Sequence, residues 1–188
     1  PAWLPTLRAT TKKHMTKINI HKSRKASRKY LKARAKFLKY ANASHELDGN
    51  DNIIGRIGEF IAYQYYLEQQ PVIVENKSNK GYDILCGDGT KVSDKTITHE
   101  SETKRTTRIK EPWDELFVVE LGKNASILRI GHLTKQQFER ARKEKEYSKT
   151  PYCKDTMLND RGMIGLYGTV ISQENLPKTV TLLKTKNI

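Results

Sequence analysis

One segment of the chain limits the fold more than any other, because it combines two short apolar runs with a tight polar turn. Residues 81–96 read GYDILCGDGTKVSDKT. Glycine and aspartate between two such runs are typical of the turn of an antiparallel β-hairpin. We therefore expect strands over 82–86 and 91–98, closed by the GDG turn. The elements on either side of this hairpin then decide the fold class.

Two helices are expected before the hairpin. The first is a basic helix over 22–42 with Ser23 as its cap, and the second covers 53–70 and ends before a proline. Gly55 and Gly58 each lower the helix propensity of the second helix by roughly 1 kcal/mol relative to alanine. Such glycines suit a place where something approaches the helix backbone closely. The residues expected to face inward are Ala26, Tyr30, Ala33, Phe37 and Ala41 in the first helix, with Leu31 and Leu38 beside them, and Ile53, Ile57, Phe60, Ile61 and Gln64 in the second.

Strand patterns dominate the rest of the chain. Strands are expected over 72–76, 113–121 and 125–130, with one or two more within 161–185. The run at 113–121, WDELFVVEL, is the clearest buried strand. The polar run at 99–112 is expected to contain a loop.

One more helix completes the predicted order of elements. It covers 135–147, because Thr134 and Gln137 form a capping box directly ahead of it. Helices, a mixed sheet, a helix and tail strands indicate an α/β (α+β) fold, with a mixed central β-sheet flanked by helices. A chain of 188 residues suffices for one domain with its own core. The expected boundaries are 1–20 for an N-terminal extension, 21–188 for the domain and about 50–147 for its catalytic core.

The positive charge is concentrated near the start of the sequence. The net charge is +14, and residues 1–40 contain 13 Lys or Arg and no Asp or Glu. The remaining residues hold 22 basic and 21 acidic side chains, so they are nearly neutral. A basic block joined to a neutral body indicates a polyanionic partner. Nucleic acid is the first candidate. An anionic membrane surface is the second, although the basic helix has a small apolar face for an anchor.

Two basic clusters are candidates for phosphate contacts. One is the polar face of the helix at 22–42, and the other is TKRTTR at 103–108. Clustered cations on a rigid face bind phosphates through counterion release, and arginine can also read guanine edges. The candidate nucleic-acid-binding residues are Arg24, Lys25, Arg28, Lys29, Lys32, Lys104, Arg105 and Arg108.

Cysteine content and hydropathy bear on the compartment. Cys86 and Cys153 are too few for a disulfide framework, and neither has a second Cys or His at metal-ligand spacing. No apolar run approaches the length of a membrane span, and no signal-like segment opens the sequence. We therefore expect a cytoplasmic protein without membrane contact.

The hairpin also carries the side chains best suited to chemistry. Side chains alternate along a strand, so Ser93 and Lys95 share one face, and Asp94 points to the other unless a bulge intervenes. Asp83 stands early in the partner strand. A carboxylate near a divalent ion, with an ammonium close by, suits phosphodiester hydrolysis, because the metal lowers the pKa of bound water. The lysine can orient that water or offset charge in the transition state.

The pattern GYDIL…VSDK, preceded by a helix that contains GEF, resembles the PD-(D/E)XK nuclease superfamily, which includes most type II restriction endonucleases. That family has an Asp at the start of one hairpin strand, an acidic-x-Lys triplet on the next, and often a Glu from the preceding helix. The resemblance implies a restriction-endonuclease-like core in which Asp83 and Glu59 hold Mg²⁺ and Lys95 is the triplet lysine. It covers roughly 53–130, and the strand at 113–121 suits the family's next core strand.

The triplet departs from the family pattern, because Ser93 stands where an acidic residue is expected. Glu59 would then carry more of the metal binding, or a bulge would bring Asp94 round. Ser93 would line the site through its hydroxyl or its carbonyl. A second registration uses Glu102 and Lys104, a literal acidic-x-Lys triplet that lies farther from the hairpin aspartate.

The function expected from these features is that of a Mg²⁺-dependent endodeoxyribonuclease acting on double-stranded DNA, as in a type II restriction endonuclease. Cutting both strands of a palindrome favours a homodimer. The leading alternative is a nucleic-acid-binding protein without catalysis that uses residues 1–40 as a basic arm. A third possibility is another kind of nuclease, such as a repair or junction-resolving enzyme or an RNA-cleaving toxin.

Overall fold

The computed structural model describes residues 19–44, 52–73, 81–99, 103–122, 126–145, 147–177 and 180. For 37–44, 52 and 53 the backbone alone is described. Nearly all of the predicted N-terminal extension, 1–20, lies outside the described residues. Within the described residues, no helix combines the length and the apolar character needed to cross a membrane.

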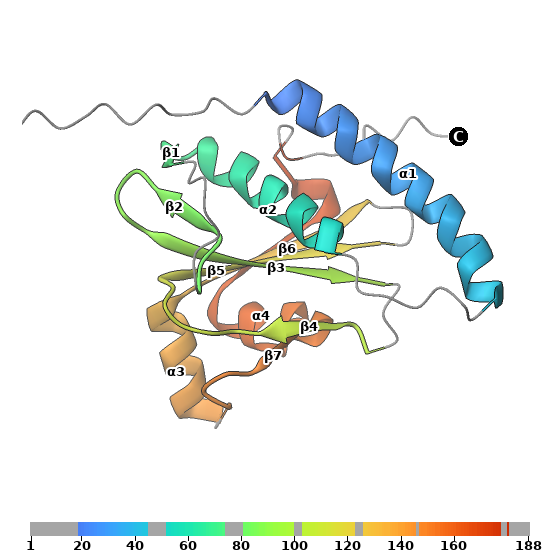
Figure 1. Ribbon diagram of the computed structural model, residues 1–188. Helices are drawn as coiled ribbons and strands as arrows, with labels where there is room; N and C mark the ends of the chain where they lie inside the picture. Colours follow the sequence, from blue (N-terminus) through green and yellow to red (C-terminus); the bar gives the residue numbers. More distant parts are fainter. Residues whose placement is uncertain are drawn as a thin grey trace, which may run out of the picture.

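A mixed six-stranded sheet forms the centre of the fold (Figure 1). The strand order is β1-β2-β3-β5-β6-β8. Strands β3 and β5 run parallel, and the other neighbours in this sheet run antiparallel. A separate two-stranded ribbon pairs β4 with β7. The strands span Val72–Ile73 (β1), Ile84–Cys86 (β2), Lys91–Thr98 (β3), Arg105–Arg108 (β4), Glu115–Leu121 (β5), Ile127–Thr134 (β6), Tyr152–Lys154 (β7) and Thr169–Ser172 (β8).

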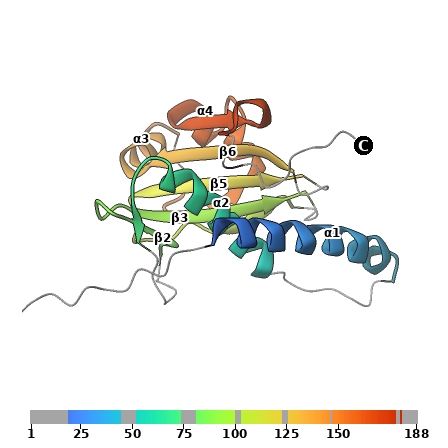
Figure 2. The same cartoon turned by 90° about the horizontal axis from the view of Figure 1, so that it is seen from above.

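Helices cover both faces of the sheet, which confirms the predicted mixed α/β class. Figure 1 shows α1 and α2 on one face, and α3, α4 and the β4–β7 ribbon on the other. Seen from above, α1 lies toward β2 and β3, whereas α3 and α4 lie toward β6 (Figure 2). The helices span Ile20–Ser44 (α1), Asn52–Leu67 (α2), Lys135–Lys145 (α3) and Met163–Tyr167 (α4), with short 3-10 turns at Asp155–Leu158 and Gln173–Asn175.

Strand β5 separates two apolar cores. Phe117 and Val119 pack with α1 and α2, whereas Leu116 and Val118 pack with α3 and α4. All four side chains are fully buried. A strand buried on both faces has a nearly continuous apolar sequence. The predicted buried strand at 113–121 is therefore confirmed.

The predicted hairpin is also confirmed. Strands β2 and β3 pair antiparallel, and the amide of Cys86 donates to the carbonyl oxygen of Thr90 at 2.9 Å across the turn. Gly89 has a φ of +92°, which glycine adopts without the steric penalty that other residues meet. The turn residues therefore close the hairpin as their sequence predicts.

The predicted N-terminal capping residues are right for α3 and wrong for α1. At α3, the amide of Thr134 donates to Gln137 Oε1 at 2.8 Å, and the Gln137 amide donates to Thr134 Oγ1 at 3.3 Å. This confirms the capping box. At α1, the predicted cap Ser23 lies inside the helix. Asn19 caps it instead, because its Oδ1 accepts the amide of Lys22 at 3.0 Å.

The inward face of α1 agrees with the prediction only in part. Tyr30 packs against the core and Leu31 is buried, whereas Ala26 and Ala33 are exposed. Arg24 turns toward the body, where its Nη2 donates to Gln64 Oε1 on α2 at 2.8 Å. An inward stripe that includes an arginine does not follow from the spacing of apolar residues.

Two further segments differ from the predicted elements. Residues 163–167 form helix α4, so β8 is the tail strand within the described residues. Residues 105–108, which were expected to be a loop, form strand β4. Strand β4 depends on its pairing with β7, which lies far along the chain. No local sequence pattern predicts that these two segments pair.

Helix α2 approaches β3 closely at Gly58. A Cβ atom there would lie 1.7 Å from Thr96 Oγ1 and 2.8 Å from Asp94 Oδ2. The predicted close approach is therefore confirmed at Gly58. A Cβ atom at Gly55 would meet nothing within 4 Å, so that explanation is wrong for Gly55.

We expect Gly58→Ala to destabilise the protein by about 1–3 kcal/mol, because the added methyl group overpacks the contact between α2 and β3. Gly55→Ala is the matched control. It should stabilise the protein by roughly 0.5–1 kcal/mol through helix propensity. Urea unfolding of both variants measures the difference, and equal effects would contradict the close approach at Gly58.

Candidate active site

Asp83 lies directly before β2, and hydrogen bonds fix its orientation. Its amide donates to the carbonyl oxygen of Val92 at 2.8 Å. Its Oδ2 accepts a hydrogen bond from the amide of Asp94 at 2.7 Å. These two bonds attach the residue to β3 through its backbone and its side chain. The carboxylate is thus held against β3 while the side chain stays 30% exposed.

Ser93 and Lys95 project from β3 to one side, as predicted, and both meet Asp83. Lys95 Nζ donates to Ser93 Oγ at 2.9 Å and to the carbonyl oxygen of Asp94 at 2.6 Å. The same ammonium lies 3.8 Å from Asp83 Oδ2, and Ser93 Oγ lies 3.5 Å from that oxygen. The fold therefore brings Asp83, Ser93 and Lys95 together.

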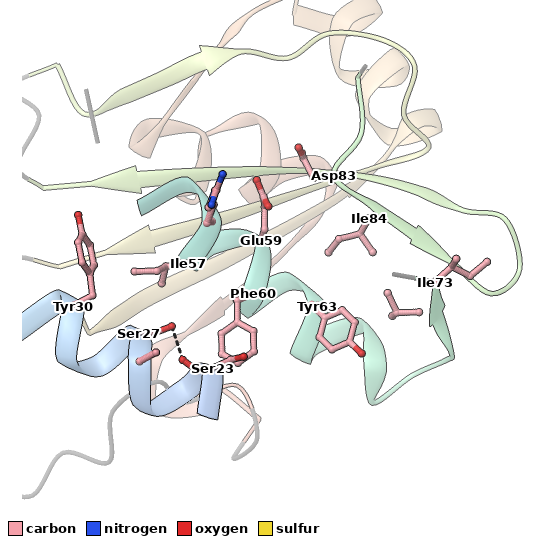
Figure 3. Close-up of a pocket in the computed structure, with 13 residues that line it drawn as sticks. Ser23, Ser27, Tyr30, Ile57, Glu59, Phe60, Tyr63, Ile73, Asp83 and Ile84 are labelled. Atoms are coloured by element: carbon pink, nitrogen blue, oxygen red, sulfur yellow. Dashed lines mark hydrogen bonds between the residues drawn. The ribbon is translucent and has the colours of Figure 1, made fainter. Parts of the chain in front are cut away.

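Glu59 reaches this region from α2. Glu59 and Asp83 both line a cavity of about 720 Å³ that α1, α2 and the first strands enclose. In Figure 3 their carboxylates extend in the same general direction from neighbouring elements. Ser93 and Lys95 do not line this cavity. Asp83 is therefore the residue that joins the cavity to the lysine.

Burial and negative charge act together on Glu59. Desolvation raises the pKa of Glu59, and the nearby Asp83 carboxylate raises it further. Arg56 and Lys95 act in the opposite direction. Neighbouring carboxylates disfavour each other's ionisation, and a bound cation would relieve that repulsion. Perturbed carboxylates at a cavity are typical of functional sites.

Asp94 lies on the other side of β3, against α2. It is 6% exposed, and its Oδ1 has no hydrogen-bond partner among the described residues. Desolvation, followed by the charge of Asp83, raises the pKa of Asp94 well above its usual value. The register between β3 and β5 is continuous from Val92 to Thr98. The alternative in which a bulge turns Asp94 toward Lys95 is therefore wrong.

The donor set at the cavity fits Mg²⁺. This ion is usually bound by one or two carboxylates and keeps several waters. Glu59 and Asp83 supply two carboxylates at one cavity, and desolvation together with their repulsion raises the pKa of Glu59. The described residues contain no group of three or more His, Cys, Asp or Glu arranged around a metal position. A Mg²⁺ ion here would therefore rely on this pair and on water.

The predicted phosphate contacts on α1 fall into two groups. Lys25, Lys29 and Lys32 are exposed. Arg24 and Arg28 are half-buried, and Arg24 bonds to α2. The three lysines present their charge to solvent, whereas Arg24 serves the contact between the two helices.

The second basic cluster also divides. Lys104 Nζ lies 3.7 Å from Asp155 Oδ2 and forms an ion pair. Arg105 and Arg108 instead extend over the ring of Tyr152, with their guanidinium carbons 4.8 and 4.2 Å from its centroid. No sequence signal marks Tyr152, because only the β4–β7 pairing brings it beside β4.

The alternative triplet of Glu102 and Lys104 gains no support. Glu102 lies outside the described residues. Lys104 pairs with Asp155, which the triplet does not involve. The cluster around Asp83 is therefore the better candidate.

Comparison with known proteins adds no assignment. Neither a scan against protein-family models nor a search of curated proteins found a match. The interactions of Asp83, Ser93, Lys95 and Glu59 are therefore the basis for a functional proposal.

Asp83→Asn should lower the pKa of Glu59, because it removes a carboxylate that disfavours ionisation of Glu59. Added Mg²⁺ or Ca²⁺ should lower the same pKa in the wild type and have much less effect in the variant. An NMR pH titration of the Glu59 carboxyl measures both effects. Asp88→Asn, in the hairpin turn, is the control. A Glu59 titration that responds neither to Asp83→Asn nor to the divalent ion would exclude a shared site.

The stability of Asp94→Asn relative to the wild type should increase with pH in metal-free solution. Below the ordinary pKa of aspartate, Asp94 is neutral in both the folded and the unfolded state. As pH rises toward the raised pKa of folded Asp94, the unfolded chain ionises more readily, so the wild type loses stability. Asparagine does not ionise, and the variant should be more stable by about 1–3 kcal/mol near pH 8. Urea unfolding across pH tests this, and a pH-independent difference would count against it.

Proposed function

We propose that this protein is a Mg²⁺-dependent endodeoxyribonuclease that cuts duplex DNA, as a type II restriction endonuclease with a restriction-endonuclease-like core. The observation that carries the proposal is the convergence at Asp83. Lys95 Nζ lies 3.8 Å from Asp83 Oδ2, and Asp83 shares one cavity wall with Glu59. Two carboxylates beside an ammonium suit the charges that develop when a phosphodiester is attacked.

The order of the elements supports this proposal. Helix α2 carries Glu59, and the hairpin of β2 and β3 carries Asp83 and Lys95. Strand β5 then runs parallel to β3 in the same sheet. These are the parts that the PD-(D/E)XK resemblance implies: a helix carboxylate, a hairpin aspartate, a lysine on the following strand and a further core strand.

Each residue has its own role in the proposed reaction. Glu59 and Asp83 hold Mg²⁺, which when bound supplies Lewis-acid chemistry to water and phosphate. Lys95 orients the attacking water and offsets charge in the transition state. Ser93 accepts a hydrogen bond from Lys95 Nζ at 2.9 Å and thereby positions the ammonium beside Asp83.

Ser93 also favours a second candidate function. A hydroxyl at this position leaves the site one carboxylate short of the family pattern. A protein with this fold that binds DNA without cutting it would need no carboxylate there. The second candidate is therefore a non-catalytic DNA-binding protein.

The proposal extends to partners and compartment. The exposed Lys25, Lys29 and Lys32 on α1 contact DNA phosphates, and two copies of the chain form a homodimer that cuts both strands. The protein acts in the cytoplasm, where buried free thiols such as those of Cys86 and Cys153 persist.

The wild type should cut supercoiled plasmid in Mg²⁺ and should not cut it in EDTA. Asp83→Ala and Lys95→Ala should each slow cleavage on the order of a hundredfold or more, because each removes charge that stabilises the transition state. Lys91→Ala is the matched control. Lys91 lies on the same strand, but its Nζ sits 5.7 Å from the ring centroid of Tyr82, so this variant should cleave normally.

The same assay separates the alternatives. Discrete fragments from a long DNA identify a restriction enzyme, whereas a smear identifies a nonspecific nuclease. Wild-type protein that binds duplex DNA and never cuts it supports the non-catalytic candidate. Cleavage that survives both Asp83→Ala and Lys95→Ala refutes the assignment.

A further inference from the structure

A cluster of cations lies beside one tyrosine on the sheet face that lies away from α1. We define the ribbon cluster as Arg105 and Arg108 on β4, Tyr152 and Lys154 on β7, and Arg161 before α4. All five residues are exposed. Figure 1 shows the β4–β7 ribbon on the opposite face of the sheet from α1 and α2. The cluster therefore lies on the opposite face of the sheet from the basic helix and from the cavity that Glu59 and Asp83 line.

The ribbon's backbone orients this cluster. Cys153 is fully buried, so its neighbours Tyr152 and Lys154 point outward. In a regular strand Arg105 and Arg108 would point to opposite faces. The β4–β7 register shifts between these two arginines, so both can lie over the ring of Tyr152. The bulge thus gathers two guanidinium groups on one aromatic ring.

A cavity of about 640 Å³ adjoins the ring. Arg108, Lys154 and Arg161 line it, together with Tyr147 and Ser148, and no carboxylate among the described residues does. This distinguishes it from the cavity beside α2, which two carboxylates line. Cations and hydroxyl groups without a carboxylate match the hydrogen-bonding and charge requirements of phosphate.

The cations of the ribbon cluster form no ion pair with any described carboxylate. The nearby Asp155 pairs with Lys104 instead. Elsewhere on this side of the sheet, arginines do have such partners, as Arg140 does with Glu144. Contact with an aromatic ring orients a guanidinium while leaving its charge uncompensated. The ribbon cluster therefore presents several cations that no described carboxylate neutralises.

We propose that the ribbon cluster is a second DNA-binding surface, which contacts consecutive phosphates of one DNA strand. The cluster extends beyond the cavity, because Arg105 lies outside it. A free phosphate would use one or two of these cations, whereas a strand, with its regular series of charges, engages them all. This inference rests on the proposed function in that it takes DNA as the partner, and it adds a binding surface on the other face of the sheet.

Binding of a fluorescent DNA duplex in EDTA, followed by anisotropy across salt concentrations, tests this proposal without cleavage. Each lost phosphate contact should reduce the slope of log affinity against log salt by roughly 0.9. The double variant Arg108→Ala/Arg161→Ala should therefore lose about 1.8 of that slope. Tyr152→Leu should also weaken binding, whereas Tyr152→Phe, which keeps the ring, should bind like the wild type.

Arg140→Ala is the matched control, since Arg140 is an exposed arginine that is paired with Glu144. It should leave both affinity and slope unchanged. The proposal is overturned if the double variant binds DNA with the wild-type slope. It is also overturned if that variant loses affinity for inorganic triphosphate or for RNA alone while its affinity for DNA stays the same.

DNA binding and DNA cleavage test this surface and the nuclease proposal separately. Asp83→Ala should bind the duplex in EDTA with the wild-type slope. A wild type that never cuts, but whose binding depends on the ribbon cluster, would remove the nuclease proposal and support this surface. A wild type that cuts, with ribbon-cluster variants that bind normally, would do the reverse.

Discussion

The hydrogen bond from the Asp94 amide to the Asp83 carboxylate is the interaction on which the candidate site depends. It is 2.7 Å long and links the residue before β2 to the middle of β3. An aspartate at the start of a strand would otherwise serve as an ordinary turn residue. Here one carboxylate oxygen is fixed beside Lys95, while the side chain still reaches the cavity wall. The Asp94 amide therefore holds the Asp83 carboxylate in a position where it meets both Lys95 and the cavity.

The packing of α2 against β3 also determines the surroundings of the acidic residues. Gly58 allows the helix to touch β3 directly, which places Glu59 at the cavity and buries Asp94. The same packing removes water from both carboxyl groups and raises the pKa of each. Carboxyl groups thus gather on the α2 side of β3, and the ammonium of Lys95 lies on the other side. Asp83, at the end of the hairpin, borders both, and this arrangement suits the roles proposed for a cation and an attacking water.

Local sequence signals predicted those parts of the fold that short segments determine. The glycine turn fixed the hairpin, and the hairpin in turn predicted that Ser93 and Lys95 would share a face. The capping box and the continuous apolar run of β5 were equally local. The inward face of α1 could be predicted only in part, because Arg24 turns inward to bond with Gln64 on another helix. Strand β4 exists through its pairing with β7, and that pairing joins segments distant in the chain.

The basic stretch at 103–108 contains both a cation that forms an ion pair and cations that form none within the described residues. Lys104 pairs with Asp155, so it must break an ion pair before it can contact a phosphate. Arg105 and Arg108, on the strand that follows, lie against an aromatic ring and keep their charge uncompensated by any described carboxylate. The same distinction separates Arg129, which Glu120 neutralises, from the cations of the ribbon cluster. Positive charge in a sequence therefore indicates a polyanionic partner, but the partner of each cation in the fold decides which of them can bind it.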